Sequence, residues 1–179
     1  MVVVSLDIGT TKICAIAVDA DTGEVLEVLS GANAFMTSES SHERIQDADR
    51  ILKISKSLCG ELIRKYSPIL CIGITGQMHG ILYLNRHGEA ISPLYTWQDQ
   101  CGNLPYRDQL SYAEYLTGNS SYRMASGFGL TTCFYHTHTG QIPPEARKIC
   151  TIQDYAALHM TGETHPIIHT SNGAGLGLF

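Results

Sequence analysis

The sequence lacks the features that nucleic-acid-binding and membrane proteins need. Charged residues make up only 16% of the chain, no run of Lys or Arg occurs, and the formal net charge is −5. Nucleic acids and anionic membranes are bound through clusters of positive charge, so we expect neither as a partner. No apolar segment approaches the roughly 18 residues of a membrane span. No basic segment precedes the early Asp7, as a signal peptide would require, and we therefore expect a cytoplasmic protein.

The sequence also lacks the cysteine spacing of a metal site. None of its six cysteines belongs to a C-x-x-C pair, and in a cytoplasmic protein we expect reduced, mostly buried thiols. His136 and His138 are separated by one residue on a predicted helix. Side chains in that spacing do not face each other, so we expect no metal site there.

Hydrophobic residues make up 44% of the chain, which is enough for a packed core. The apolar runs Val2–Leu6 and Ile13–Val18 flank a glycine-containing turn and predict a β-hairpin. A third strand is expected over Val25–Leu29, which makes an antiparallel meander. A helix capped by Asp47 is expected to run to Tyr66, with one apolar stripe facing the sheet.

Downstream of this helix, the continuous apolar run Ile69–Ile74 predicts a central strand that is buried on both faces. A strand over Ile81–Leu84 and a helix beginning near Asp99 and carrying Leu104 are expected next. Further helices are expected at the following places: Tyr112–Leu116, Thr131–His138, and from a capping Thr151 to Gly162. The predicted fold class is α/β, with a mixed sheet and flanking helices.

The turn between the first two strands has the composition of a phosphate site. Gly9 allows backbone N–H groups to approach anionic oxygens, Thr10 and Thr11 add hydroxyl donors, and Lys12 adds a positive charge. Asp7 is a candidate ligand of Mg²⁺, through water. The alternative is an ordinary turn in which Asp7 and the threonines satisfy their own backbone.

A second candidate segment, Gly76–Gly80, follows the Ile69–Ile74 strand. Gln77 and His79 can both donate and accept hydrogen bonds, which suits sugar hydroxyls, and Met78 offers an apolar surface. The alternative is a plain turn between strands with a solvated histidine. Trp97, the single tryptophan, is either a core residue or a platform that stacks on a ligand.

These segments together resemble the FGGY family of carbohydrate kinases, which contains xylulokinase and glycerol kinase. The Gly76–Gly80 sequence G-Q-M-H-G is similar to one family motif, and the others follow in family order. They are Thr96-Trp97-Gln98-Asp99, Ser126-Gly127-Phe128-Gly129, Ile152-Gln153-Asp154-Tyr155, Met160-Thr161-Gly162-Glu163 and Ser171-Asn172-Gly173-Ala174-Gly175. The resemblance covers nearly the whole chain, and the motif spacing is most similar to that of sedoheptulokinases, then xylulokinases.

The resemblance implies a ribonuclease-H-like fold of the actin, hexokinase and sugar-kinase superfamily. It implies ATP and Mg²⁺ as cofactors and a ketose as the small-molecule substrate, phosphorylated on a terminal hydroxyl. Asp7, Gly9, Thr10, Thr11 and Lys12 would bind the nucleotide phosphates, with Asp7 on the metal. The substrate contacts would come from the following residues: Gln77, Met78, His79, Trp97 and Asp99.

One position departs from the family pattern, because Cys101 stands where the family usually has an arginine that could brace Asp99. The resemblance also implies that residues 1–179 are an N-terminal domain, and that the catalytic base and the adenosine-binding domain lie beyond Phe179. We expect this chain alone to be inactive, with exposed apolar side chains at Leu176, Leu178 and Phe179, and a homodimer is possible. The alternative from another class is a non-catalytic sugar- or nucleotide-binding module.

Overall fold

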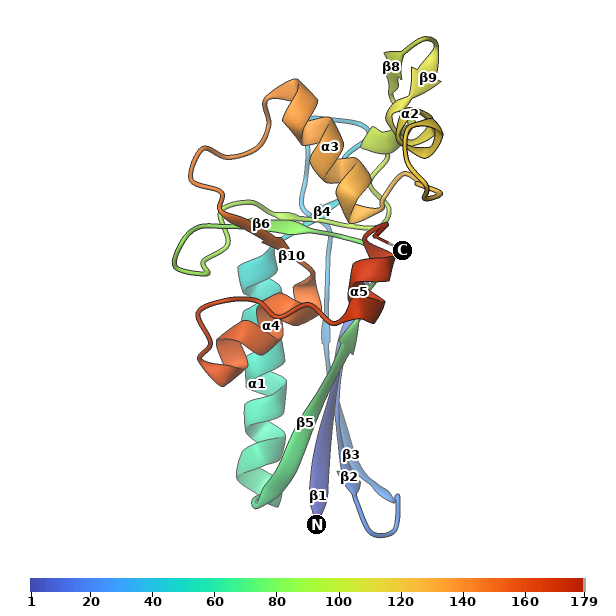
Figure 1. The fold of residues 1–179 in the computed structure, drawn as a ribbon. Coiled ribbons are helices and arrows are strands. Elements are labelled where there is room, and N and C mark those ends of the chain that lie inside the picture. The colour runs from blue at the N-terminus through green and yellow to red at the C-terminus, as the bar shows by residue number, and fades with distance from the viewer. Residues whose placement is uncertain (179) are drawn as a thin grey trace.

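The computed structural model describes residues 1–178, and its main sheet confirms the predicted meander (Figure 1). The sheet has the strand order β3-β2-β1-β5, with β1 antiparallel to β2, β2 antiparallel to β3, and β1 parallel to β5. The strands are β1 (Val2–Ile8), β2 (Lys12–Asp19), β3 (Val25–Ala32) and β5 (Ile69–Gly76). Because β5 runs parallel to β1, the sheet is mixed, as predicted.

Helix α1 (Ala48–Tyr66) covers one face of this sheet and begins where the sequence predicts. The Asp47 side chain accepts a hydrogen bond from the Arg50 N–H at 2.9 Å, which caps the helix. Ile51 and Leu62 are fully buried against alternate residues of β1 and β2. Alternation along a strand therefore places every second residue of β1 on the face away from α1.

The prediction of a central, doubly covered strand at residues 69–74 is wrong. Among residues 1–178, β5 pairs only with β1 and forms an edge of the sheet. Its Leu70 is 57% exposed, and Ile72 is exposed as well. A continuous apolar run shows that a strand is hydrophobic, but it does not specify how many neighbours the strand has.

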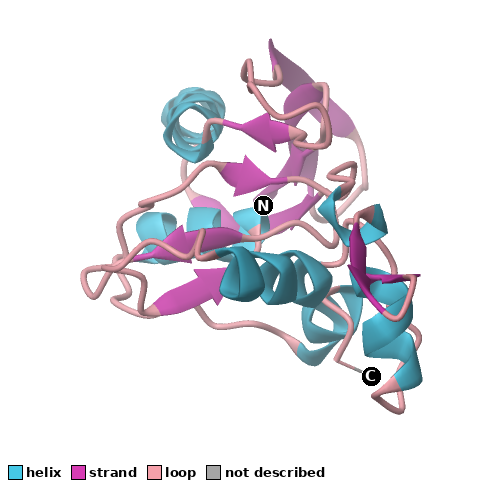
Figure 2. Ribbon diagram, turned by 90° about the horizontal axis from the view of Figure 1, so that it is seen from above, coloured by secondary structure: helices cyan, strands magenta, loops and turns pink. Residues whose placement is uncertain are grey.

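A second layer of short strands and helices lies above the main sheet in Figure 1, and Figure 2 shows these elements from above. Its two-stranded pairs are β4 (Ile45–Gln46) with β7 (Leu94–Tyr95), β6 (Leu82–Leu84) with β10 (Lys148–Cys150), and β8 (Pro105–Arg107) with β9 (Leu110–Ser111). Its helices are α2 (Tyr112–Gly118), α3 (Gly129–Thr139), α4 (Ile152–Thr161) and α5 (Thr170–Gly175). None of the helices in the described part of the chain has the length and hydropathy of a membrane span.

Two further expectations need correction. The helix expected near Asp99 is only a single 3₁₀ turn, η1 (Cys101–Asn103), because Pro105 forces the preceding Leu104 into an extended conformation. Leu176, expected to be exposed, is 2% exposed and packs in a second core with Ile81 and Tyr83. Leu178 is 43% exposed as expected, and Phe179 lies outside the described residues.

The predicted cap of α4 is present in a modified form. The Thr151 hydroxyl accepts a hydrogen bond from the Asp154 N–H at 3.3 Å and donates one to the Asp154 carboxylate. The carboxylate thus meets the hydroxyl of Thr151 instead of its backbone N–H. Gly162 ends the helix in the left-handed conformation, as predicted.

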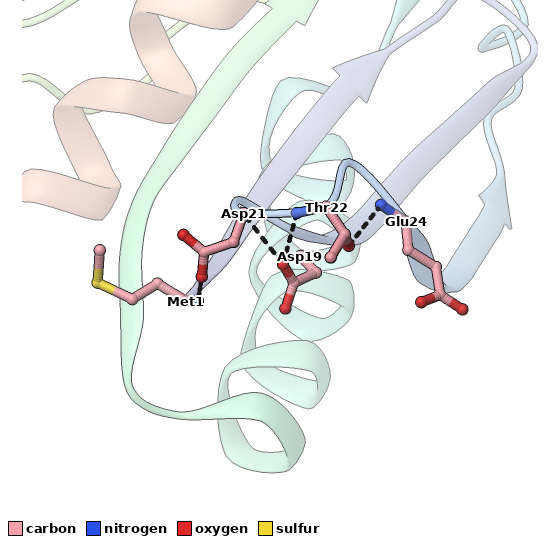
Figure 3. Close-up of polar contacts among 5 residues, drawn as sticks. All are labelled: Met1, Asp19, Asp21, Thr22 and Glu24. Atoms are coloured by element: carbon pink, nitrogen blue, oxygen red, sulfur yellow. Dashed lines mark hydrogen bonds and ion pairs between the residues drawn. The ribbon is translucent and has the colours of Figure 1, made fainter.

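The β2–β3 turn lies at the end of the sheet away from the second layer (Figure 1), and Figure 3 shows its polar contacts. The Asp19 carboxylate accepts hydrogen bonds from the N–H groups of Asp21 and Thr22. The amino group of Met1 forms an exposed ion pair with Asp21 at 2.6 Å. Exposed pairs of this kind contribute little to stability, so Asp21 is a suitable position for a control substitution.

Buried His136 makes the stability of the second layer depend on pH. Its Nδ1 lies 2.9 Å from the Tyr83 hydroxyl, and burial, with a smaller effect from His42, lowers the pKa of His136 to about 4. An unfolded histidine titrates near ~6.5, so between these values the unfolded state binds a proton that the native state does not. The contribution of His136 to the free energy of unfolding is therefore fully present above about pH 6.5, and it is lost as the pH falls toward 4.

Between about pH 7.5 and about pH 5, the titration of His136 should lower the free energy of unfolding of the wild-type protein by about 2 kcal/mol. We expect His136→Gln to abolish this part of the pH dependence. The measurement is urea unfolding of both proteins at the two pH values. His138→Gln is the control, because His138 is exposed and its change should leave the difference intact. A wild-type pH dependence in His136→Gln would contradict the assignment.

Candidate functional site

The backbone of the β1–β2 turn has two N–H groups that no oxygen of the described residues accepts from. The Gly9 N–H donates to the Lys12 carbonyl at 3.0 Å, and a Cβ on residue 9 would lie 2.7 Å from that same oxygen. The turn therefore requires glycine. Within residues 1–178, neither the Thr10 N–H nor the Thr11 N–H donates to a protein oxygen. Two adjacent unpaired N–H groups at a tight turn are suited to an anionic oxygen.

Asp7 lies at the end of β1, on the sheet face away from α1. Its carboxylate is exposed and forms no ion pair or hydrogen bond within the described residues. The exposed Thr75 of β5 is its cross-strand neighbour, a residue that sequence reasoning missed. An exposed, uncommitted carboxylate next to free N–H groups fits Mg²⁺, which is commonly held by one or two carboxylates and several waters. Lys12, at the start of β2, is exposed on the same side.

The carbonyl groups of the turn accept hydrogen bonds from two buried residues, Asn33 and Gln46. Asn33 Nδ2 donates to the Gly9 carbonyl at 3.0 Å, and the Asn33 N–H donates to the Thr11 carbonyl at 2.9 Å. Gln46 Nε2 donates to the Thr10 carbonyl at 2.7 Å. These bonds to its carbonyls fix the backbone of the turn and leave the N–H groups of Thr10 and Thr11 available to a ligand. Sequence reasoning missed both residues, since neither belongs to a motif or a periodic pattern.

Gln77 connects the turn to the G-Q-M-H-G segment. Its N–H donates to the Ile8 carbonyl at 2.8 Å, and its Nε2 donates to Gln46 Oε1 at 2.7 Å. The Thr10 hydroxyl donates to Gln77 Oε1 at 3.3 Å. The predicted phosphate residue Thr10 and the predicted sugar residue Gln77 are thus in direct contact.

Trp97 also reaches the turn, because its indole Nε1–H donates to the Thr10 hydroxyl at 3.0 Å. The side chain is 45% exposed, so the core alternative for Trp97 is wrong. Gly127, with φ +83°, packs on the backbone of Trp97, where an added Cβ would lie 2.0 Å from the Trp97 carbonyl oxygen. The family-like G-F-G segment therefore supports the W-x-D segment by backbone contact.

The side chain of Asp99 is buried, unlike that of a residue exposed for contact with a substrate. It is 1% exposed, and its carboxylate accepts hydrogen bonds from the Cys101 N–H at 2.9 Å and the Arg44 N–H at 3.3 Å. These two backbone N–H groups hold the Asp99 carboxylate in this chain, in which Cys101 stands at the position of the family arginine. Burial raises the pKa of the Cys101 thiol, which therefore stays neutral. The role of Asp99 toward a substrate remains a prediction.

Met78 and His79 lie next to Gln77, beside α5. Met78 is 52% exposed, and His79 has a left-handed backbone with φ +73°. The His79 ring stacks on Phe128 at 4.7 Å between ring centres, and its Nδ1 contacts the Gly175 carbonyl. A small cavity here is also lined by Gln153, whose buried Oε1 has no hydrogen-bond partner within the described residues. Gln153 is a further candidate contact that its family motif could have indicated.

The other histidine candidates do not join the site. His136 is buried against Tyr83, whereas His138 is exposed next to Phe134. Residues 1–178 contain no cluster of three or more His, Cys, Asp or Glu side chains that could hold a metal ion.

The sequence of this chain is similar to those of known sugar kinases. The chain is 28% identical to mouse sedoheptulokinase over an alignment that covers 99% of the chain and 42% of that protein. It is 29% identical to xylulose kinase of Streptomyces coelicolor, over 90% of the chain and 34% of that protein. The chain therefore spans less than half the length of these curated relatives.

A solved structure shows the same fold. Xylulose kinase from Rhodospirillum rubrum superposes with a TM-score of 0.80 at 18% identity, covering 100% of this chain and 38% of that one. This confirms the predicted fold, a mixed sheet with flanking helices of the sugar-kinase type. The model of the N-terminal domain of the FGGY family of carbohydrate kinases matches residues 2–177, and the chain belongs to that family.

Proposed function

We propose that the full-length protein carrying this chain transfers the γ-phosphoryl group of Mg·ATP to a terminal hydroxyl of a ketose. The contact that carries the proposal is made at Thr10. Its turn offers two free N–H groups, and its hydroxyl binds both Gln77 and Trp97. A phosphate placed on the turn would thus lie next to a ligand held by the sugar-side residues. That proximity is what transfer between two bound reactants requires.

Each residue of this chain then has a defined task. The N–H groups of Thr10 and Thr11, with Lys12, bind phosphate oxygens, and Asp7 holds the hydrated Mg²⁺. The metal, when bound, neutralises charge on the phosphates. Gln77, Met78, His79 and Trp97 orient the ketose, with Trp97 offering its exposed ring as a platform. The base that accepts the hydroxyl proton is proposed to lie outside residues 1–179.

Among ketoses we propose sedoheptulose as the preferred substrate and xylulose as the second. The motif spacing and the similarity to mouse sedoheptulokinase support this order. We expect kcat/KM of the full-length protein to be about 10-fold or more higher for sedoheptulose than for xylulose. The ratio of the two kcat/KM values is the quantity to compare, because it defines the specificity of an enzyme. The measurement is a coupled ADP-release assay with both sugars at matched Mg·ATP.

A 10-fold preference for xylulose in that assay would reverse the proposed order. The alternative, a non-catalytic binding module, is decided by isothermal titration of the same protein with each ketose and with ATP. Binding without ADP release would favour the module, whereas ketose-dependent release supports the kinase.

A further inference from the structure

Gln46 is a fully buried amide in the middle of the proposed site. Its exposed fraction is 0%, and it lies in β4, immediately before the residue that caps α1. A buried polar side chain is destabilising unless its hydrogen-bonding groups have partners. The partners of Gln46 therefore show what the residue does.

Those partners belong to the two halves of the site. Gln46 Nε2 donates to the Thr10 carbonyl at 2.7 Å, on the phosphate side. Gln46 Oε1 accepts from Gln77 Nε2 at 2.7 Å, on the sugar side, and from Asn33 Nδ2 at 3.3 Å. One planar amide thus spans the turn and the G-Q-M-H-G segment with both of its polar atoms.

The contact between Thr10 and Gln77 closes this arrangement into a ring. The Thr10 hydroxyl donates to the Gln77 oxygen, so each of the three residues bonds to the other two. Gln77 cannot turn toward a ligand or away from it without changing its bonds to Gln46 and Thr10. A carboxylate at position 46 could not donate to the Thr10 carbonyl, and an apolar side chain could bond to neither partner.

We propose that Gln46 is a positioning residue, which holds Gln77 and the Gly9–Thr11 turn in a fixed relation so that ketose and nucleotide phosphates are presented to each other. The inference rests on the proposed function. It predicts that loss of the Gln46 amide lowers the turnover rate itself, since misplacement by about 1 Å can cost ~100-fold. A residue that served stability alone would change the folded fraction and leave turnover per folded molecule unchanged.

The test compares Gln46→Met, which keeps the side-chain length and removes both polar atoms, with Leu62→Ala in the full-length protein. Leu62 is fully buried on α1 beneath the sheet and forms no part of the site, so its truncation is a control for lost stability. We expect Gln46→Met to lower kcat by about 10- to 100-fold per folded molecule, and Leu62→Ala to leave kcat within about 2-fold. Gln46→Asn, whose shorter amide cannot reach both partners, should fall between wild type and Gln46→Met.

A kcat and KM of Gln46→Met within 2-fold of the Leu62→Ala values would overturn the inference. Fluorescence of Trp97 provides a second readout that does not need activity. Trp97 is the single tryptophan of residues 1–179, and its indole is bonded to Thr10, so the emission measured on this chain reports on the turn. We expect Gln46→Met to shift that emission and Leu62→Ala to leave it in place.

The two readouts separate the possible failures. If wild-type protein phosphorylates no ketose, the proposed function fails, and the Trp97 emission alone decides the role of Gln46. Unchanged emission in Gln46→Met would then overturn the inference, and a shift would support it. If Gln46→Met does not fold, the comparison of Gln46→Asn with Leu62→Ala decides in the same way.

Discussion

Asp7→Asn is expected to lower kcat of the full-length protein by well over 10-fold while the KM for the ketose barely changes. The substitution keeps the size of the side chain and removes the charge that anchors the metal. The Asp7 carboxylate is exposed and has no protein partner within residues 1–178, so its loss should cost little stability. The change in kcat then reports on the metal and the phosphates directly. The measurement is steady-state kinetics at several Mg²⁺ concentrations.

Asp21→Asn is the matched control for this variant. Asp21 is also an exposed aspartate, but it lies in the β2–β3 turn, where its carboxylate pairs only with the amino group of Met1 among residues 1–178 (Figure 3). It should turn over at the wild-type rate. Wild-type kcat and an unchanged Mg²⁺ dependence in Asp7→Asn would remove Asp7 from the metal site.

Purified residues 1–179 alone are expected to release ketose-dependent ADP at less than a hundredth of the rate of the full-length protein. Neither of the two carboxylates assigned to the site is available to act as the base. Asp7 is assigned to the metal, and Asp99 is 1% exposed with its oxygens bonded to backbone N–H groups. With neither free to accept the hydroxyl proton, the chain holds reactants without a base.

The assay couples ADP release to a spectroscopic readout, with sedoheptulose and xylulose as acceptors and the full-length protein measured in parallel. Release without sugar is the background for both proteins. Orientation of both reactants can supply about 7–11 kcal/mol of the barrier, so a half-site should lose far more than 100-fold. Release by the chain alone within 100-fold of the full-length rate would place the base inside residues 1–179.

Local patterns predicted the elements that depend on local chemistry. The β1–β2 hairpin, α1 with its Asp47 cap and α4 with its Thr151 cap are confirmed, because turns, caps and apolar periodicity act over a few residues. Two of the errors concern neighbours distant in sequence, whereas the helix expected near Asp99 is cut short by the nearby Pro105. Nothing in residues 69–74 indicates that β5 pairs with a single strand among residues 1–178, and nothing near Leu176 indicates that it packs on Ile81.

The same distinction applies to the site. The turn residues and Gln77 were predicted from their motifs, which carry chemistry in short, readable segments. Gln46 and Asn33 were missed, because their importance arises only where separate strands bring them beneath the turn. The burial of Asp99 could not be predicted either, since it depends on the backbone of Arg44, far away in sequence.

Chemical-shift mapping by NMR on this chain tests the central claim most directly, which is that one site joins a phosphate turn to a ketose surface. Amide and indole signals are followed while Mg·ADP and a ketose are added separately. We predict that Mg·ADP perturbs the amides of Gly9–Lys12, and that the ketose perturbs Gln77–His79 and the Trp97 indole, which is bonded to Thr10. If neither Mg·ADP nor the ketose changes the signals of these two segments, the account is contradicted.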